Sequence, residues 1–364
     1  MLGDILNYNQ LPGWDDDDHA AALSSFLKSA RVMLEKTPKS RGLSISGEAL
    51  RDISDWLFHL DEGVLGDEAR IFFETHFVPR AIKPNDNPQP SDRGFVTGYF
   101  EPEVLGSRQK SERFSTPLLR RPLDLVRVVD VAEEFIPENW DKEIRFAKQG
   151  ESGQIEPYMD RADILNGGLD GQGLEIVFLE SPIDAFFIHI QGSARIRLED
   201  NSFMRVSYAA KTGHDYTPIG RLLIERNEIA REEMSMEAIR SWLTEHADQQ
   251  NEVMSHNRSY IFFSEVMGLD PEDGPIGAGG VPLSTRRSLA VDRTLHTFGT
   301  PIFLNADLDE PFQYLMIAQD TGSAIVGPAR GDIYFGAGQD AEREAGAIQH
   351  AADFYLLWPK HQPI

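Results

Sequence analysis

The final third of the chain consists of short apolar runs separated by turns, and this pattern limits the possible folds more than any other feature. The runs stand at 260–263, 289–291, 301–304, 314–318, 324–326, 333–335 and 354–358. Short strands between glycine- or proline-containing turns are typical of a β-barrel or a β-sandwich. The N-terminal third has a different, helical spacing of apolar residues. It predicts helices that begin near His19 and that cover 46–60 and 66–78.

A strand is also predicted from Phe95, in FVTGYFE, far from the strand-rich end. The segment between them is mixed, with strands expected at 174–179, 185–191 and 203–209 and a helix at 235–250. We therefore predict a mainly β protein with helices, built as a discontinuous domain of residues 1–102 and 259–364. Residues 103–258 form an inserted domain. Residues 81–94 are rich in Pro, Asn and Asp and predict a loop.

The charge of the chain excludes several partners. There are 59 acidic and 35 basic residues, which gives a net charge of −24. Nucleic acids are polyanions that require a basic surface, so a nucleic-acid partner is not expected. A neutral polymer such as a sugar chain is compatible with this charge. The chain has no cysteine, which excludes disulfides, thiol catalysis and cysteine-based zinc sites.

The sequence contains no apolar run of the length that a membrane span needs, so no membrane span is expected. The first residues, MLGDILNYNQ, lack a basic stretch followed by an apolar one, so no signal segment is recognised in this chain. Either the protein does not use the general secretion route, or the signal is absent from this sequence.

Three aspartates in the final third are candidates for chemistry, and each stands at a strand end beside turn residues. They are Asp292 in SLAVDRT, Asp320 in MIAQDTG and Asp332 in ARGDIYFG. Asp320 and Asp332 would end neighbouring strands and could face one space. A carboxyl close to another in a poorly solvated site keeps its proton at higher pH, as a general acid must. The alternative is that all three are ordinary turn aspartates.

Other catalytic and binding motifs are absent from the sequence. There is no G-x-S-x-G elbow and no H-E-x-x-H pair, and the glycine-rich stretch 273–280 lacks the Lys-Ser/Thr of a phosphate-binding loop. We interpret it as a flexible loop. Residues 168–173 do not form a complete calcium loop. The histidines occur singly, and His189 is interpreted as a packed strand residue. We predict neither a metal nor a cofactor.

Several long segments resemble one known family, the membrane-bound lytic murein transglycosylase A family. The resemblance is carried by LPGWDDDDHAAALSSFLKSA, VTGYFEPEVLGS, SPIDAFFIHIQGSARIRLEDNSFMRVSYAAKTGHDYTPIGRLL, NRSYIFF, GVPLSTRRSLAVDRTLHTFGTPIFL and MIAQDTGSAIVGPARGDIYFGAGQDAEREAG. The last two segments resemble the three-aspartate domain of a broader superfamily. The IQGSARI segment makes the resemblance specific to the family.

The resemblance implies a double-psi β-barrel, a smaller inserted β-rich domain, and a groove between them that binds the glycan strands of peptidoglycan. It implies Asp332 as the acid/base, with Asp320 beside it. The reaction would cleave the β-1,4 bond between N-acetylmuramic acid and N-acetylglucosamine and form a 1,6-anhydro product. The substrate-binding residues expected on this basis are Tyr99, Glu101, Gln191, Ser193, Asp292, Gly322 and Gly336.

The resemblance also implies the periplasm or cell envelope of a Gram-negative bacterium, and we expect a monomer. Three alternatives stay open at this point. The chain could be a glycan-binding module without catalysis, or a hydrolase that uses water with Asp320 or Asp292 as the base. It could also be a divalent-metal protein that uses the three aspartates as ligands.

Overall fold

The computed structural model describes residues 2–58, 67–84, 93–268, 273–307, 311–322 and 324–362. The chain forms two compact units, one of Met1–Glu101 with Leu269–Ile364 and the other of Pro102–Gly268. The second boundary lies about ten residues beyond the predicted one at 259. The reason is that β12 (Ile261–Val266) pairs along its length with β11 (Phe203–Lys211) in the sheet of the inserted unit.

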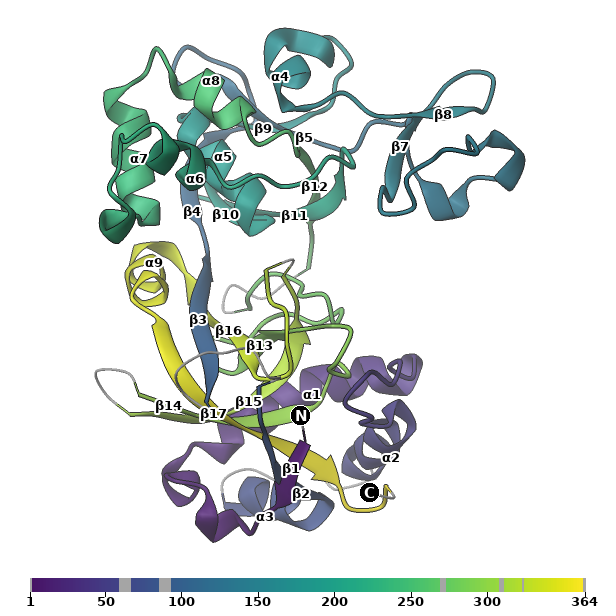
Figure 1. The fold of residues 1–364 in the computed structure, drawn as a ribbon, viewed down its shortest axis with the longest axis vertical. Helices are drawn as coiled ribbons and strands as arrows, with labels where there is room; N and C mark the ends of the chain where they lie inside the picture. The colour runs from purple at the N-terminus through teal and green to yellow at the C-terminus, as the bar shows by residue number, and fades with distance from the viewer. Residues whose placement is uncertain are drawn as a thin grey trace. The chain divides into compact units, whose positions relative to one another are not determined.

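The first unit is built on a closed β-barrel. Its strands are β1 (Leu2–Ile5), β2 (Phe77–Ile82), β3 (Gly94–Glu101), β13 (Ser288–Val291), β14 (Pro301–Ala306), β15 (Phe312–Asp320), β16 (Arg330–Ala337) and β17 (Gln349–Pro359). The hydrogen-bonded order is β1-β2-β17-β14-β15-β13-β16-β3, and β17 also pairs with β3. That extra pairing closes the ring from β17 through β14, β15, β13 and β16 to β3 (Figure 1).

Parallel and antiparallel pairs alternate around part of this ring. β13 runs parallel to β15, and β16 runs parallel to β3, whereas β13 and β16 are antiparallel. The strands are rich in residues that are fully buried, such as Val96, Leu289, Ile333 and Phe354. Gly331 is required on β16 because a Cβ there would lie 2.9 Å from Leu289 and 3.1 Å from Phe354. Five of the predicted apolar runs, 289–291, 301–304, 314–318, 333–335 and 354–358, thus lie in strands of this barrel and supply its core. The run at 260–263 leads into β12 of the inserted unit, and the run at 324–326 forms no strand.

Helices from the N-terminal third cover part of the barrel. They are the short η1 (Tyr8–Gln10) and η2 (Trp14–Asp16), followed by α1 (His19–Glu35), α2 (Gly47–Phe58) and α3 (Asp67–His76). As predicted, Asp18 caps α1, with its side chain accepting a hydrogen bond from the backbone N–H of Ala21 at 3.0 Å. α1 packs against β15, α2 and α3 and buries Phe26, Ala30 and Met33. A further helix, α9 (Gly338–Gly346), packs on β3 and β16.

A buried ion pair joins the start of these helices to the barrel. The Asp17 carboxylate is 2.9 Å from the Arg287 guanidinium, and both side chains are almost fully buried. Asp17 also accepts a hydrogen bond from the backbone N–H of Leu315 at 2.7 Å. Breaking one partner of such a pair would leave an uncompensated buried charge, which costs about 3–5 kcal/mol. The acidic run DDDD therefore contributes a helix cap and a buried anchor to the fold.

The second unit is a mixed sheet with helices. Its main sheet has the order β12-β11-β10-β4-β9-β5, and β6-β7-β8 form a smaller one. The strand bounds not yet given are β4 (Glu103–Ser107), β5 (Thr116–Leu119), β6 (Leu125–Arg127), β7 (Phe146–Gln149), β8 (Ile155–Glu156), β9 (Glu175–Leu179) and β10 (Ser193–Leu198). The helices are η3 (Val128–Asp130), η4 (Glu133–Phe135), α4 (Arg161–Asp163), η5 (Ile164–Gly168), α5 (Pro182–Gln191), α6 (Ile219–Glu225), η6 (Arg231–Glu233), α7 (Met236–Glu245) and α8 (Gln250–Ser255).

The strand predicted over 185–191 is wrong, because this segment belongs to helix α5. Ser181 caps the helix by accepting a hydrogen bond from the N–H of Asp184 at 3.3 Å, and Pro182 occupies the first turn. Gly192 ends it with a left-handed φ of 81°. The apolar run AFFIHI was misinterpreted because a buried helix and a buried strand give similar short apolar runs. His189 is packed, as interpreted, but on a helix.

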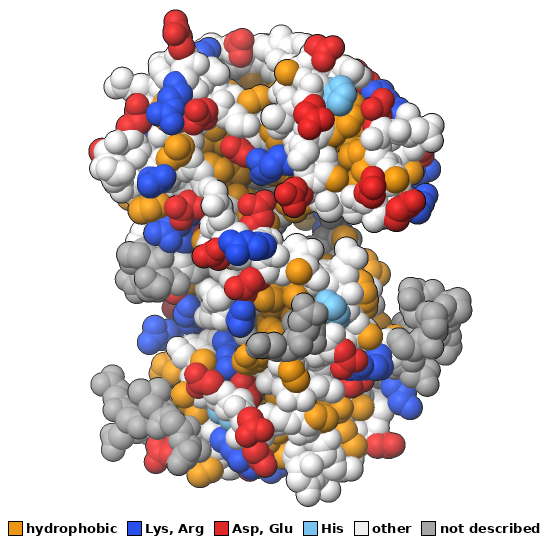
Figure 2. All heavy atoms as spheres, turned by 90° about the vertical axis from the view of Figure 1, so that its left-hand side faces the viewer, with side chains coloured by type: hydrophobic (Ala, Val, Ile, Leu, Met, Phe, Trp, Pro, Cys, Tyr) orange, Lys and Arg blue, Asp and Glu red, His pale blue; other side chains and the backbone are white. Residues whose placement is uncertain are grey.

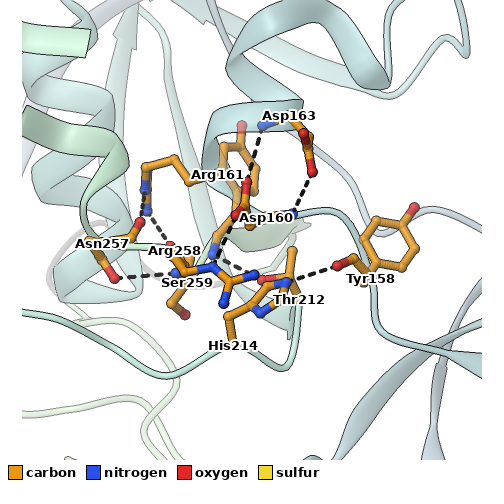
Figure 3. Close-up of polar contacts among 10 residues, drawn as sticks. Tyr158, Asp160, Arg161, Asp163, Thr212, His214, Asn257, Arg258 and Ser259 are labelled. Atoms are coloured by element: carbon orange, nitrogen blue, oxygen red, sulfur yellow. Dashed lines mark hydrogen bonds and ion pairs between the residues drawn. The ribbon is translucent and has the colours of Figure 1, made fainter. Parts of the chain in front are cut away.

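A buried arginine organises the polar interior of this unit (Figure 3). Arg161 is 2% exposed and donates to the carbonyls of Asn257 at 2.9 Å and Ser259 at 2.6 Å. Its guanidinium also lies 2.9 Å from Nδ1 of His189, and burial lowers the pKa of that histidine well below its ordinary value. These contacts hold α4 against the segment that leads into β12, so we regard the cluster as structural.

The surface of the protein carries charged side chains of both signs. On the face drawn in Figure 2, lysine and arginine side chains are interspersed with aspartate and glutamate. Within the described ranges, no helix combines the length and the apolar content that crossing a bilayer requires.

Candidate active site

The register of the barrel strands places two of the three aspartates in one row. β13 lies between β15 and β16, and its Ala290 is paired with Asp320 on one side and with Asp332 on the other. On the far side of β16, Asp332 is paired with Thr97 of β3. Neighbouring strands are about 4.8 Å apart, so the Cα atoms of the two aspartates are separated by roughly 10 Å. The two aspartates therefore do not stand on neighbouring strands, as predicted, because β13 with its Ala290 lies between β15 and β16.

A β-bulge aligns Asp320 with this row. The pairing of β13 with β15 advances from Leu289–Ala318 to Ala290–Asp320, so Gln319 is an extra residue on β15. A bulge turns the following side chain relative to the regular alternation. Without it, Asp320 would be displaced from the row by one position.

The bulge residue is held by a complete set of hydrogen bonds. The Gln319 side chain is fully buried, and its Nε2 donates to the Ser25 carbonyl and to Oγ of Ser29, each at 2.8 Å. Its Oε1 accepts from the hydroxyls of Ser25 and Ser288. A fully satisfied buried network of this kind specifies one local geometry. α1 therefore fixes the strand end that carries Asp320.

Asp332 is half-buried and has a single close hydrogen-bond donor among the described residues. The Thr97 hydroxyl donates to its Oδ1 at 2.5 Å. Burial raises the pKa of the Asp332 carboxyl above its ordinary value, because the protein replaces the water that would solvate the anion. The Thr97 bond and the charge of Arg330 oppose that rise, and the negative charge of Asp320 adds to it.

Asp320 has more donors than Asp332. Tyr99 donates its hydroxyl to Oδ2 at 2.9 Å, and the backbone N–H of Ala278 donates to Oδ1 at 2.9 Å. Burial raises the pKa of Asp320, while bonds from Ala278, Thr321 and Tyr99 oppose the rise. The glycine-rich stretch 273–280, interpreted above as a flexible loop, thus supplies a donor to this carboxylate.

The loop that carries Ala278 is fixed to its surroundings on several sides. Asp273 forms an ion pair with Lys28 of α1 at 2.6 Å. The N–H of Gly279 donates to the Gln319 carbonyl at 2.8 Å, and the N–H of Gly277 donates to the carbonyl of Val281 at 2.9 Å. This segment is an ordered cover over the end of β15.

Asp320 accepts hydrogen bonds from more donors than Asp332 does, and this difference separates the two carboxyls chemically. Hydrogen bonds to a carboxylate favour its charged form, so the surroundings of Asp320 favour a negative charge more than those of Asp332 do. That charge in turn favours the protonated form of Asp332. Two neighbouring carboxyls whose surroundings push their pKa values apart are a typical acid–base arrangement.

Tyr99 donates to Asp320 from the same strand on which Thr97 donates to Asp332. It lies on β3 two residues beyond Thr97, so both side chains share one face of the strand. Burial, and then the charge of Asp320, raise the pKa of the Tyr99 hydroxyl well above its ordinary value, so it remains a donor at neutral pH. Its ring lies 5.3 Å from that of Tyr334, its register partner on β16.

The third aspartate does not join this row of side chains. The Asp292 carboxylate is 7% exposed and accepts bonds from the N–H and hydroxyl of Thr294, at 2.9 and 2.6 Å, and from the N–H of Gly327 at 2.9 Å. Burial raises its pKa, but these bonds outweigh that effect and the net shift is downward. Asp292 is therefore held as a carboxylate within its turn, which is what the turn-residue alternative expects. Its predicted contact with substrate gains no support from this geometry.

The other predicted binding residues of this unit differ in exposure. Gly322 is exposed two residues after Asp320, and its carbonyl accepts a hydrogen bond from the N–H of Ile325 at 3.0 Å. Gly336 is buried with φ of 103°, and a Cβ there would lie 3.0 Å from the Thr285 hydroxyl, so this bulged position of β16 needs glycine. Glu101 is fully buried at the end of β3, so its carboxylate presents no surface to a sugar.

Gln191 and Ser193 belong to the inserted unit. Gln191 is the half-buried last residue of α5, and Ser193 is the buried first residue of β10. Gly192 between them accepts a hydrogen bond from the N–H of Tyr208 at 2.7 Å. Their roles in binding stay predictions.

The sequence analysis missed several residues of the site. Thr97, Arg330 and Ala290 were overlooked, although Thr97 and Arg330 stand two positions before Tyr99 and Asp332. Alternate residues of a strand share a face, so this spacing was a usable signal. The Ala278 contact had no such signal, because a backbone N–H is the same in every non-proline residue.

A closed β-barrel that holds two buried carboxyls in one row, both with raised pKa values, fits one class of protein, the acid–base enzymes. Comparisons with known proteins make the assignment more specific. Residues 95–264 match the family model described as "MltA specific insert domain", and residues 287–358 match the "3D domain".

Solved structures match nearly the whole chain. A membrane-bound lytic murein transglycosylase from Agrobacterium tumefaciens is 40% identical, and the match covers 98% of this chain and 97% of that one with a TM-score of 0.85. The MltA structure from Neisseria gonorrhoeae is 28% identical over 99% of this chain and 93% of that one, with a TM-score of 0.82.

The chain belongs to the membrane-bound lytic murein transglycosylase A family. The match to the solved structures confirms the predicted fold, a double-psi β-barrel domain with an inserted domain. Among curated relatives, the Vibrio cholerae protein of that name is 35% identical over 213 residues, which is 56% of each chain. The Escherichia coli K12 protein is 32% identical over 273 residues, 72% of this chain and 64% of the relative. The matched part thus spans less than two thirds of either curated relative.

Proposed function

We propose that this protein is a lytic murein transglycosylase, which cleaves the β-1,4 bond between N-acetylmuramic acid and N-acetylglucosamine with Asp332 as its single acid and base. The observation that carries the proposal is the row that holds Asp332, with one hydrogen-bond donor and a raised pKa, and Asp320, with several donors. The family of the chain and the names of its relatives support the substrate class.

In the first step, Asp332 acts as the general acid. It donates its proton to the glycosidic oxygen, the bond from C1 to that oxygen breaks, and N-acetylglucosamine leaves as an alcohol. The muramic sugar becomes an oxocarbenium-like cation. Asp320 keeps its negative charge throughout and favours the protonated form of Asp332 at the start of the cycle.

In the second step, the same carboxyl acts as the base. The Asp332 carboxylate removes the proton from the C6 hydroxyl of the muramic sugar, and the C6 oxygen bonds to C1. The product is the 1,6-anhydro sugar, and the proton from the C6 hydroxyl returns Asp332 to its protonated form, while the proton that it donated leaves on N-acetylglucosamine. No water is consumed, and because the attack is intramolecular, much of its entropic cost is already met.

The remaining sequence-based predictions enter as proposals. Tyr99, Gln191, Ser193, Gly322 and Gly336 contribute to binding of the glycan; aromatic rings, amides, hydroxyls and backbone N–H groups all bind sugars. The protein acts as a monomer on peptidoglycan strands in the periplasm or cell envelope of a Gram-negative bacterium.

The substitution Asp332→Asn tests the proposal. Asn keeps the size of the side chain and can still accept the Thr97 bond, but it has no proton to donate at neutral pH. We expect release of soluble fragments from purified peptidoglycan to fall by at least about 10²–10⁴-fold, with sedimentation binding to the same material unchanged. Asp292→Asn serves as the matched control and retains turnover. Turnover by Asp332→Asn at the wild-type rate would contradict the proposal.

A chelator tests the metal alternative in the same assay. Within the described part of the chain, no group of three or more His, Asp or Glu side chains is arranged to hold a metal ion. We expect full activity after treatment with EDTA. Loss of activity that added divalent cation restores would favour the metal-dependent alternative.

A further inference from the structure

Arg330 stands beside the proposed acid without binding it. It lies two residues before Asp332 on β16 and is half-buried on the same face of the strand. Its Nη2 donates to Oγ1 of Thr97 at 2.8 Å, its Nη1 donates to the Gly331 carbonyl, and its guanidinium lies 5.4 Å from the centre of the Phe95 ring. Among the described residues, no ion pair joins Arg330 to Asp332.

The Thr97 hydroxyl has only one hydrogen to donate. Because its oxygen accepts from Arg330, that hydrogen is directed to the remaining neighbour, Oδ1 of Asp332, at 2.5 Å. An oxygen that accepts this short bond is the one that carries no proton. The transferable proton of Asp332 is thereby assigned to Oδ2.

We propose that Arg330 is a positioning residue for the transglycosylase reaction: it acts through Thr97 to keep Oδ1 of Asp332 an acceptor, so that Oδ2 alone donates and recovers the proton. The inference rests on the proposed function of Asp332. Arg330 touches neither the reacting atoms nor, directly, the acid.

The Thr97 hydroxyl lies between Arg330 and Asp332. This arrangement explains how an arginine can lie near the acid without forcing it to ionise. A guanidinium paired directly with a carboxylate lowers the carboxyl pKa by about 1–3 units and would remove the acid at neutral pH. With Thr97 between the two groups, Arg330 acts on Asp332 only by its charge at a distance, which opposes part of the rise that burial causes in the pKa of Asp332. The carboxyl can then serve as acid in one step and as base in the next.

The other titratable groups around Asp332 come from each neighbouring strand. β15 contributes Asp320, and β3 contributes Tyr99, which senses the charges of both aspartates. β16 itself contributes Tyr334, whose ring packs on Tyr99. From β17, the uncharged Gln349 is the register partner of Thr97.

Helix α9 packs on β3 and β16 and carries further charges, which pair elsewhere. Its Glu344 binds Arg286, and its Asp340 binds Arg343, all of them at exposed positions. The helix also carries Glu342, which is half-buried. Arg330 is accordingly the cation that acts on Asp332 in this environment.

The test uses Arg330→Met and Thr97→Val in the whole chain, with Thr97→Ser as the conservative variant and Arg80→Met as the control. Arg80 is a partly buried arginine of the same unit that donates to the Gly3 carbonyl. We expect kcat to fall by about 10–100-fold in Arg330→Met and Thr97→Val with KM unchanged, as for loss of positioning. Thr97→Ser and Arg80→Met stay close to wild type.

The pH profile separates positioning from a structural role. Arg330 and Thr97 favour the Asp332 anion, so their removal raises its pKa. The limb on which activity falls as pH rises should move to higher pH by about one unit in both variants. The kcat of the double variant at its optimal pH should match that of Thr97→Val alone, because Arg330 positions Asp332 through Thr97 and the two residues act in series. An unchanged limb in Arg330→Met, or a raised KM with normal kcat, would overturn the proposal.

A measurement without turnover keeps this test separate from the proposed function. The pKa of Asp332 can be followed by carbon-13 NMR of the aspartate carboxyls, assigned by the resonance that Asp332→Asn removes. We expect a higher pKa in Arg330→Met and Thr97→Val, and a wild-type value in Thr97→Ser. If Thr97→Ser behaves like Thr97→Val, the positioning proposal fails, whatever the products of the wild-type enzyme are.

Discussion

Two aspartates of this barrel show how the same residue is put to opposite uses. Asp292 is saturated by donors from Thr294 and Gly327, which lower its pKa in spite of burial. Asp332 has one close donor, Thr97, and burial raises its pKa. Asp292 stabilises a turn. Asp332 keeps its proton to higher pH than an ordinary aspartate, and its burial lowers the stability of the fold at neutral pH.

This contrast predicts opposite effects of one substitution on stability. A carboxyl with a raised folded-state pKa favours folding at low pH, and that contribution is lost as pH rises through the folded pKa. At pH 7, Asp332→Asn should therefore raise the free energy of unfolding, by about 1.4 kcal/mol per unit of pKa difference. The gain should shrink as the pH falls through the raised folded-state pKa of Asp332, and it should be gone below about 4, the ordinary pKa of an unfolded aspartate.

Asp292→Asn should do the reverse. Its lowered pKa stabilises the fold above the unfolded pKa, and this contribution is lost as pH falls through the folded pKa. In this variant, the introduced amide group would face the N–H of Gly327, donor against donor, so we expect a loss of about 1–3 kcal/mol at pH 7. Urea unfolding of both variants at pH 7 and pH 4 provides the comparison. Equal signs for the two variants at pH 7 would refute the contrast.

The Tyr99 hydroxyl donates a hydrogen bond to Asp320 and thereby favours the charged form of that carboxyl. Tyr99→Phe should raise the pKa of Asp320, and the limb on which activity appears as pH rises should move upward by about one unit. Tyr355→Phe, which removes a hydroxyl elsewhere in the barrel, is the control. Initial rates measured across the pH range decide the point, and coincident profiles of Tyr99→Phe and wild type would show that Asp320 does not need this donor.

At the scale of elements, one bulge and one loop build the site. The extra residue Gln319 aligns Asp320 with Ala290 and Asp332, and α1 holds Gln319 through Ser25 and Ser29. The loop at 273–280 then covers the end of β15 and donates from Ala278. The N-terminal helices and the glycine-rich loop, neither of which carries an acid of the site, are thus needed to set the charge of Asp320.

Gly277→Ala should disturb this cover. A Cβ at Gly277 would lie 2.7 Å from the Gln319 carbonyl and 2.6 Å from Leu283, so the loop must move and the Ala278 bond to Asp320 is lost. Loss of one hydrogen bond to a charged group corresponds to about a tenfold fall in kcat. Gly346→Ala, where a Cβ meets nothing within 4 Å, is the control. Steady-state rates of the two variants, with circular dichroism spectra to verify folding, test this; equal rates would contradict it.

At the scale of the molecule, the sequence predicted the fold class, the family and the two aspartates, because each depends on local patterns. The turns around Asp320 and Asp332 and the apolar runs of the barrel are visible in short windows. The bulge at Gln319 is not, because it depends on how β15 pairs with a strand far away in the sequence. The two-residue spacing of Thr97 and Arg330 was a usable signal for the faces of their strands, but the contact between the two residues requires knowing that β3 pairs with β16.

The wrong prediction at 185–191 has a different cause. Ser181, Pro182 and Gly192 are local signals for the start and end of a helix, and they were present in SPIDAFFIHIQG. Partial alternation of apolar and polar residues was given more weight than these caps. Short apolar runs are better assigned from their flanking residues than from periodicity.

The central claim is that the Asp332 carboxylate is protonated again by the substrate's own C6 hydroxyl, whose oxygen then bonds to C1. Digestion of peptidoglycan in water enriched in oxygen-18, followed by mass spectrometry of the released muropeptides, tests it directly. The account predicts anhydro-muramyl ends that contain no heavy oxygen, because water never reacts at C1. Reducing ends that carry one oxygen-18 atom would show that water attacks the sugar and would contradict the account.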